Sequence, residues 1–164
     1  VSYSSIESGA SNTCALTPFG ELWCWGDNTK SQIADPADQM ARKQPRVPGE
    51  FVGMTFSKVS IGPEADFTAA LKSDGGIAVW GTYNGVEYDD HFVLNTGTAT
   101  DIAAGENHVC YIESGAVTCA GSNSAGQTTV PSLTDPQSVH AGKDWSCAGL
   151  SDGSYTCWGS KAGW

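Results

Sequence analysis

The six cysteines fall into pairs whose spacing suits either disulfide bonds or metal ligation. The partners lie ten, nine and ten positions apart, as Cys14 and Cys24, Cys110 and Cys119, and Cys147 and Cys157. On antiparallel strands joined by a short turn, facing Cβ atoms lie about 4.5–5.5 Å apart, which approaches disulfide geometry. The pairs lack the Cys-x2–4-Cys spacing of structural zinc sites. We therefore predict three hairpin disulfides, with zinc ligation and free thiols as the alternatives, and an extracellular, secreted or cell-surface location.

The other residues capable of chemistry form no catalytic motif. His108 and His140 are expected to make structural hydrogen bonds, and His140 to line a central channel. Residues 87–91, which end in His91, offer oxygen and nitrogen ligands but lack the Asp-x-Asp-x-Asp-Gly spacing of a calcium loop, so we assign no metal. The chain has no Gly-x-Ser-x-Gly, phosphate-loop or His-Glu-x-x-His motif. We expect no catalytic residue, no cofactor and no enzyme activity.

The cysteine pairs belong to a unit that occurs four times. Each unit has an apolar strand, a turn containing glycine and a second strand closed by glycine, and the second unit carries Ala69 and Val79 in place of cysteines. An Ile/Val-x-x-Gly signature precedes each copy and is expected on an inner strand, at Ile6, Val59, Ile102 and Val139. A tandem unit of this length indicates stacked supersecondary elements, and no window has helical periodicity. The predicted fold class is all-β.

The aromatic residues fall into two groups, those that recur at one position of the repeat and those that do not. Trp25, Trp80 and Trp158 occupy one repeat position and are predicted to pack between repeats. Non-recurring aromatic side chains are candidates for an exposed binding surface: Trp23, Tyr83, Tyr88, Phe92, Trp145 and Trp164.

A long insertion follows the first unit. Residues 27–58 include Arg42, Lys43 and Arg46 and are interpreted as a solvated loop or, alternatively, an interaction loop. We expect binding first at 27–58 and then at a loop formed by residues 83–92. The candidate binding residues are Arg42, Lys43, Arg46, Tyr83, Tyr88, His91, Phe92 and Trp145.

Several stretches resemble the regulator of chromosome condensation repeat family. The resemblance rests on residues 70–75 with Val79-Trp80-Gly81, and on residues 105–108 with the Ser-Asn-Ser-Ala-Gly-Gln segment that follows Gly121. It implies a β-propeller, or an arc, of four blade-like repeats of an extracellular, disulfide-bearing type. The family's Gly-x-x-His position is His108 in the third unit, but Asn12 and Trp145 in the first and fourth.

The predicted organisation is one repeat domain, 1–164, with units at about 1–52, 53–96, 97–134 and 135–164, the last one incomplete. An incomplete sheet leaves an edge that recruits strands. Residues 1–5 would close a ring, another copy would complete an arc, or the chain would belong to a longer parent.

The net charge of the chain limits the classes of partner that we expect. The net charge of −10 disfavours nucleic acid and anionic lipid, and no apolar run reaches the roughly 20 residues that insert into a membrane. We expect a secreted, non-catalytic binding module that recognises a protein or, in a lectin-like way, a carbohydrate. The alternative is a structural protein whose arcs associate into a coat or fibre, as a homo-oligomer.

Overall fold

The computed structural model describes residues 1–33, 42–94 and 97–160, and within these ranges the chain is almost entirely β-structure. The helical exception there is a short 3-10 turn, η1 (Gly49–Phe51). The all-β prediction is confirmed. In the described ranges, no helix has the length and apolar character needed to cross a membrane.

The described strands form four antiparallel sheets in chain order. The first contains β1 (Ser5–Ser8), β2 (Asn12–Leu16), β3 (Leu22–Gly26) and β4 (Arg42–Arg46). The second contains β5 (Phe56–Ser60), β6 (Phe67–Lys72), β7 (Ile77–Tyr83) and β8 (Val86–Val93). The third contains β9 (Ala99–Ala104), β10 (His108–Glu113) and β11 (Ala116–Gly121), and the fourth β12 (Pro136–Ala141), β13 (Trp145–Leu150) and β14 (Tyr155–Gly159).

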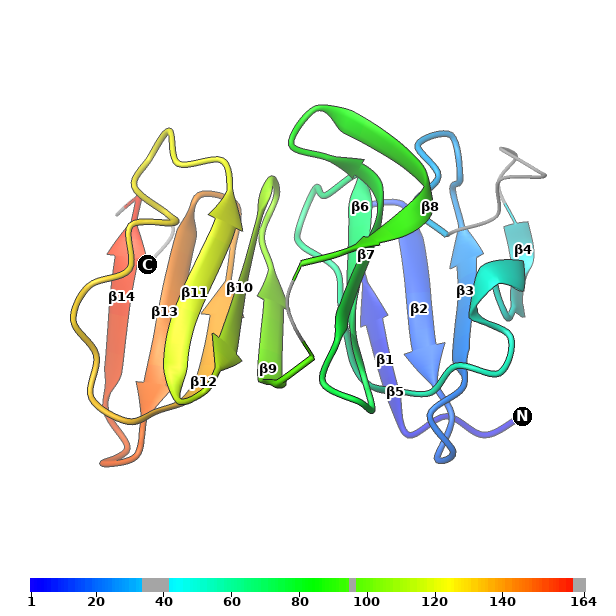
Figure 1. Ribbon diagram of the computed structural model, residues 1–164. Coiled ribbons are helices and arrows are strands. Elements are labelled where there is room, and N and C mark those ends of the chain that lie inside the picture. The colour runs from blue at the N-terminus through cyan, green and yellow to red at the C-terminus, as the bar shows by residue number, and fades with distance from the viewer. Residues whose placement is uncertain (34–41, 95–96, 161–164) are drawn as a thin grey trace.

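The sheets stack face to face as the blades of an open propeller arc (Figure 1). The first and last blades lie at opposite ends of the arc (Figure 1). The N–H of Ser4 donates to the carbonyl of Leu16, 2.7 Å away in the first blade. Residues 1–5 therefore extend the first blade, so the alternative in which they close a ring onto the fourth blade is not the one that the structure shows.

The inner strands are equivalent, as predicted. Ile6, Val59, Ile102 and Val139 each pair with the residue that follows the first cysteine position of their own hairpin. The side chains of Val59, Ile102 and Val139 pack in core clusters with residues of the preceding blade. Val59, Ile102 and Val139 are 2%, 0% and 1% exposed, whereas Ile6 is 59% exposed because no described blade precedes the first.

Close backbone contact between blades explains the glycine that ends the Ile/Val-x-x-Gly signature. A Cβ added to Gly105 would lie 2.5 Å from the carbonyl oxygen of Gly142, and one added to Gly62 would overlap Gly105. Only glycine permits this approach, so the signature marks where neighbouring inner strands meet.

The predicted disulfides are present. Cys14–Cys24, Cys110–Cys119 and Cys147–Cys157 are cross-strand pairs with Cα atoms 4.0–4.1 Å apart. Ala69 faces Val79 at the same register in the second blade, and both are fully buried, as expected.

Two predicted loops are partly strands, and two aromatic predictions need correction. Residues 42–46 of the insertion form β4, and residues 83–92 span the β7–β8 hairpin. β4 pairs with β3, and β8 pairs with β7, so β4 and β8 are the outer strands of their blades.

Tyr83 is 6% exposed and packs edge-on against Phe67, so it is a core side chain. Trp80 and Trp158 are buried as predicted, but Trp25 is only partly buried.

Candidate functional site

A buried hydrogen-bond network joins the first blade to the second. The backbone carbonyl of Gln32 accepts from the indole Nε1 of Trp80 and from Oγ1 of Thr68, both at 2.9 Å. Nδ2 of Asn12 donates to Thr68 Oγ1 at 3.0 Å and lies 3.3 Å from the same carbonyl. Because all four residues are at most 2% exposed, each bond forms away from water, where leaving a polar group unpaired costs about 1–3 kcal/mol.

The loop after β3 positions that carbonyl. Gln32 folds its side chain back, accepting the Lys30 N–H at 2.8 Å and donating to Asp27 Oδ2 at 3.1 Å. Asn28 Oδ1 accepts the Ile33 N–H at 3.0 Å. The side-chain amides thus satisfy the loop's own backbone and leave the Gln32 carbonyl directed at the next blade.

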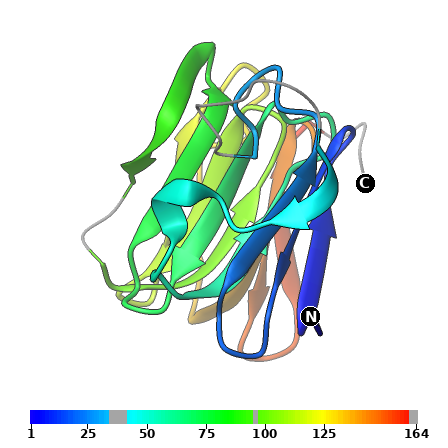
Figure 2. The same ribbon diagram turned by 90° about the vertical axis from the view of Figure 1, so that its right-hand side faces the viewer.

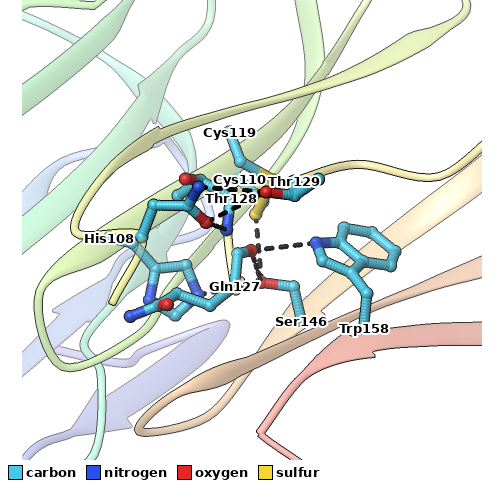
Figure 3. The surroundings of a disulfide bond; sticks show 9 residues. His108, Cys110, Cys119, Gln127, Thr128, Thr129, Ser146 and Trp158 are labelled. Atoms are coloured by element: carbon cyan, nitrogen blue, oxygen red, sulfur yellow. Dashed lines mark hydrogen bonds between the residues drawn. A yellow bond between two sulfur atoms is a disulfide. The ribbon is translucent and has the colours of Figure 1, made fainter. Parts of the chain in front are cut away.

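The third and fourth blades repeat this arrangement (Figure 3). The carbonyl of Gln127 accepts from Trp158 Nε1 and from Ser146 Oγ, both at 2.9 Å. His108 takes the place of Asn12, with its Nε2 2.8 Å from Ser146 Oγ. The Ser146 hydroxyl proton is committed to Gln127, so Nε2 of His108 carries a proton and donates.

Burial lowers the pKa of His108 below its usual value, partly offset by a backbone hydrogen bond at Trp145 and the charge of Asp144. The imidazole is therefore neutral at pH 7. A fully buried, neutral histidine that joins two blades has a structural role, which agrees with the sequence-based interpretation.

At the corresponding positions, the junction between the second and third blades is apolar instead. Phe67 stands at the Asn12 and His108 position, and Val109 at the position of Thr68 and Ser146. Phe67 and Val109 are fully buried in the same core cluster. At these positions the arc therefore alternates polar, apolar and polar contacts between successive blades.

An apolar hollow lies where the first hairpin meets the end of the insertion. It encloses about 350 Å³. Phe19, at the β2–β3 turn, is 83% exposed, and Val52, just after η1, is 70% exposed. The lining residues are Phe19, Glu21, Val47, Phe51, Val52, Gly53, Met54 and Thr55.

The hollow has a rigid floor. Phe51 is 1% exposed and packs on Phe56 and Trp80, with ring centroids 5.4 and 4.8 Å apart. The Phe56 N–H donates to the Gly20 carbonyl at 2.8 Å, which ties the insertion to the hairpin turn. Gly20 has φ +81°, and a Cβ there would lie 2.9 Å from the Phe56 carbonyl oxygen, so the turn needs glycine.

A second, more polar depression of about 300 Å³ follows the inner strands. His140 lies here with Glu7, Lys58 and Trp145, along the inner strands of the arc. Lys58 forms an ion pair with Asp101 at 2.5 Å, and Asp101 also accepts the Val139 N–H at 2.9 Å. These contacts tie the inner strands together.

The structure does not bring the predicted binding residues into one site. Trp145 is partly buried at the inner strands, and Tyr83 lies in the core. The other predicted residues lie on outer strands, and their side chains lie outside the described part of the structure: Arg42, Lys43, Arg46, Tyr88, His91 and Phe92. Their role in binding remains a prediction.

Sequence reasoning missed both the hollow and the Gln32 carbonyl. A phenylalanine in a hairpin turn, Phe19, was the available signal for the hollow, since turns favour polar residues. The shared pattern Gly-x-Asn-x-x-x-Gln, ending at Gln32 and Gln127, was the signal for the network.

Comparison with known proteins agrees with this geometry. The sequence model of the family described as "Regulator of chromosome condensation (RCC1) repeat" matches residues 3–32, which contain Asn12, Trp25 and Gln32. The predicted resemblance is confirmed. No curated protein matches the sequence.

Solved structures extend the RCC1-type likeness along the chain. Human WBSCR16 superposes with a TM-score of 0.81 at 18% identity, covering 96% of this chain and 47% of its own. Prp20p from Saccharomyces cerevisiae superposes with a TM-score of 0.76 at 18% identity, and the match covers 95% of this chain and 44% of Prp20p. The CRINKLY WD40 ectodomain of the Arabidopsis thaliana receptor kinase ACR4 gives 0.64 at 19% identity, with 96% and 49% covered.

These likenesses show the fold. The described strands form an open arc of propeller blades with the fold of these structures, and the chain spans about half the length of these three structures.

Proposed function

We propose that this chain is a non-catalytic module that binds a protein partner in the apolar hollow between the first hairpin and the insertion. The observation that carries the proposal is the strong exposure of Phe19 and Val52 around a floor formed by buried Phe51. Exposed apolar side chains that surround a hollow are typical of interaction sites. A rigid floor lowers the ordering cost of binding.

The lining favours a protein over a glycan. Phenylalanine, valine and methionine side chains dominate it, and neither tryptophan nor tyrosine is among the residues that line it. An apolar anchor residue fits such a surface. Glu21 at the rim and the net charge of −10 favour basic residues beside that anchor.

Similar proteins support a binding role and an extracellular location. Prp20p has binding properties toward Gsp1p and histones, and the ACR4 structure is a receptor-kinase ectodomain. Disulfides persist in oxidising compartments, so the three bridges support secretion or display at the cell surface.

Peptide selection on the oxidised protein tests the proposal. Peptides selected from a displayed library should contain an apolar residue beside Lys or Arg. In fluorescence anisotropy, the Phe19→Ser/Val52→Ser variant should bind them at least about tenfold more weakly. Val86→Ser is the matched control, because Val86 is 52% exposed on the separate β7–β8 hairpin.

Two outcomes would contradict the proposal. Equal binding by the double variant and wild type would place the site elsewhere. Glycan-array binding that the double variant loses, without peptide binding, would instead favour the lectin-like function.

A further inference from the structure

The outer face of the first blade, defined here by Tyr3, Ile6, Thr13, Trp23 and Trp25, resembles half of an interblade junction. Figure 2 views the arc from the end at which this blade lies. Thr13 pairs with Trp25 across the hairpin, as Thr68 pairs with Trp80 and Ser146 with Trp158.

In the covered blades, those two positions form the receiving side of the polar junction. Thr68 and Trp80 both donate to the carbonyl of Gln32 in the preceding blade, and Thr68 also accepts from Asn12. In the same way, Ser146 and Trp158 both donate to the carbonyl of Gln127, and Ser146 is hydrogen-bonded to His108. Thr13 and Trp25 carry the same groups on a blade that no described blade precedes.

Burial on this face is incomplete. Ile6 is 59% exposed, against 2% for Val59 at the same position of the second blade. Thr13 and Trp25 are partly exposed, whereas Thr68 and Trp80 are fully buried. The indole Nε1 of Trp23 is buried, and among the described residues it has no hydrogen-bond partner.

The chemistry of the face distinguishes between the two junction types of the arc. An apolar junction would have residues like Val109 and Ala120 at these positions. Thr13 and Trp25 instead match the polar junction, whose other side supplies an amide or imidazole donor and a loop carbonyl.

We propose that this outer face docks a further RCC1-type blade from outside residues 1–164, one that presents Asn or His to Thr13 and a glutamine-loop carbonyl to Trp25. Human WBSCR16 and Prp20p are about twice as long as this chain, so this fold accommodates additional blades. A second copy fits less well, because the fourth blade has Trp145 where the polar junction needs Asn12 or His108. That indole ring packs over Gly142.

The chain itself supplies a probe for this proposal. Residues 97–134, which include His108 and Gln127, are fused ahead of Ser2, so that Ile6 follows them at the spacing of Val139. The matched control fuses residues 53–96, with Phe67 at the His108 position, ahead of Val1, so that Ile6 follows at the spacing of Ile102. Indole N–H exchange is followed by NMR, with the Trp25 signal assigned through Trp25→Phe.

The fusion with residues 97–134 should slow Trp25 indole exchange on the order of tenfold or more relative to the unmodified chain and raise the urea midpoint. The fusion with residues 53–96 should do neither. Thr13→Val in the first fusion should remove most of the gain.

Equal protection by both fusions, or by neither, would overturn the proposal. So would light scattering that finds the unmodified chain dimeric with Trp25 protected, since a second copy would then occupy the face. A monomer with rapid Trp25 exchange is the expected result.

Discussion

Trp80 donates its indole N–H to the backbone carbonyl of Gln32, 48 positions earlier in the chain and in the neighbouring blade, at 2.9 Å. The same bond joins Trp158 to Gln127. The repeated tryptophan therefore contributes a directed hydrogen bond as well as apolar area, and this bond fixes the register of one blade on the next.

Removing that donor should destabilise the fold. Trp80→Phe keeps an aromatic ring but leaves the buried Gln32 carbonyl with one donor fewer, so urea unfolding should show a loss of about 1–3 kcal/mol. Trp25→Phe is the matched control and should cost less than about 0.5 kcal/mol, because Trp25 is partly exposed at the end of the arc. Equal losses in the two variants would contradict this role of the indole N–H.

A fourth disulfide should form in the second blade. Ala69 and Val79 face each other at the register of the three cysteine pairs, and both are fully buried. The Ala69→Cys/Val79→Cys variant should gain about 2–3 kcal/mol in the chain-entropy model, seen as a higher urea midpoint. Reduction should add eight protons in mass spectrometry instead of six, and a six-proton shift would show that the hairpin register is wrong.

The polar junction between the third and fourth blades should be exchangeable for the apolar one. Ser146→Val alone leaves His108 and the Gln127 carbonyl each with one partner fewer and should cost about 1–3 kcal/mol in urea unfolding. Adding His108→Phe reproduces the Phe67 and Val109 pair and should recover part of that loss. A double variant whose loss equals the sum of both single losses would show that the pairing is not responsible.

Stability should fall in mildly acidic solution because of His108. Its pKa is lowered in the folded state, so below the unfolded value of about 6.5 the unfolded chain binds the proton more readily. This contribution is fully present above pH 6.5 and is lost as the pH falls toward the folded pKa. Urea midpoints between pH 7.5 and 5.5 should decrease for wild type and change less for His108→Asn, and parallel curves would refute the assignment.

The β2–β3 turn should determine whether the apolar hollow forms. Gly20→Ala places a Cβ against the Phe56 carbonyl oxygen at positive φ, so it should separate residues 47–55 from the hairpin and cost about 1–3 kcal/mol. Hydrogen exchange of the Phe56 N–H should accelerate with it. Gly153→Ala is the control, because its φ is also positive at +84° but no atom lies within 4 Å of the added Cβ.

The sequence by itself determined the repeat register, the inner strands and the cysteine pairing. Each depends on spacing within one hairpin, where Cys14 must face Cys24 once the turn is placed. The glycine of the Ile/Val-x-x-Gly signature was equally visible, although its cause, contact between Gly105 and Gly142, is a relation between blades.

The tertiary structure decided what lies between blades. Tyr83 is buried in a core cluster that includes Ile102 and Val109 of the third blade. Trp25 is partly exposed, although Trp80 at the same repeat position is fully buried. Whether a side chain is buried depends on which blade covers its face, and the repeat pattern in the sequence does not show which blade that is. The apolar hollow likewise needs residues 47–55 to fold back onto the turn at Gly20, a long-range backbone contact that side-chain patterns do not encode.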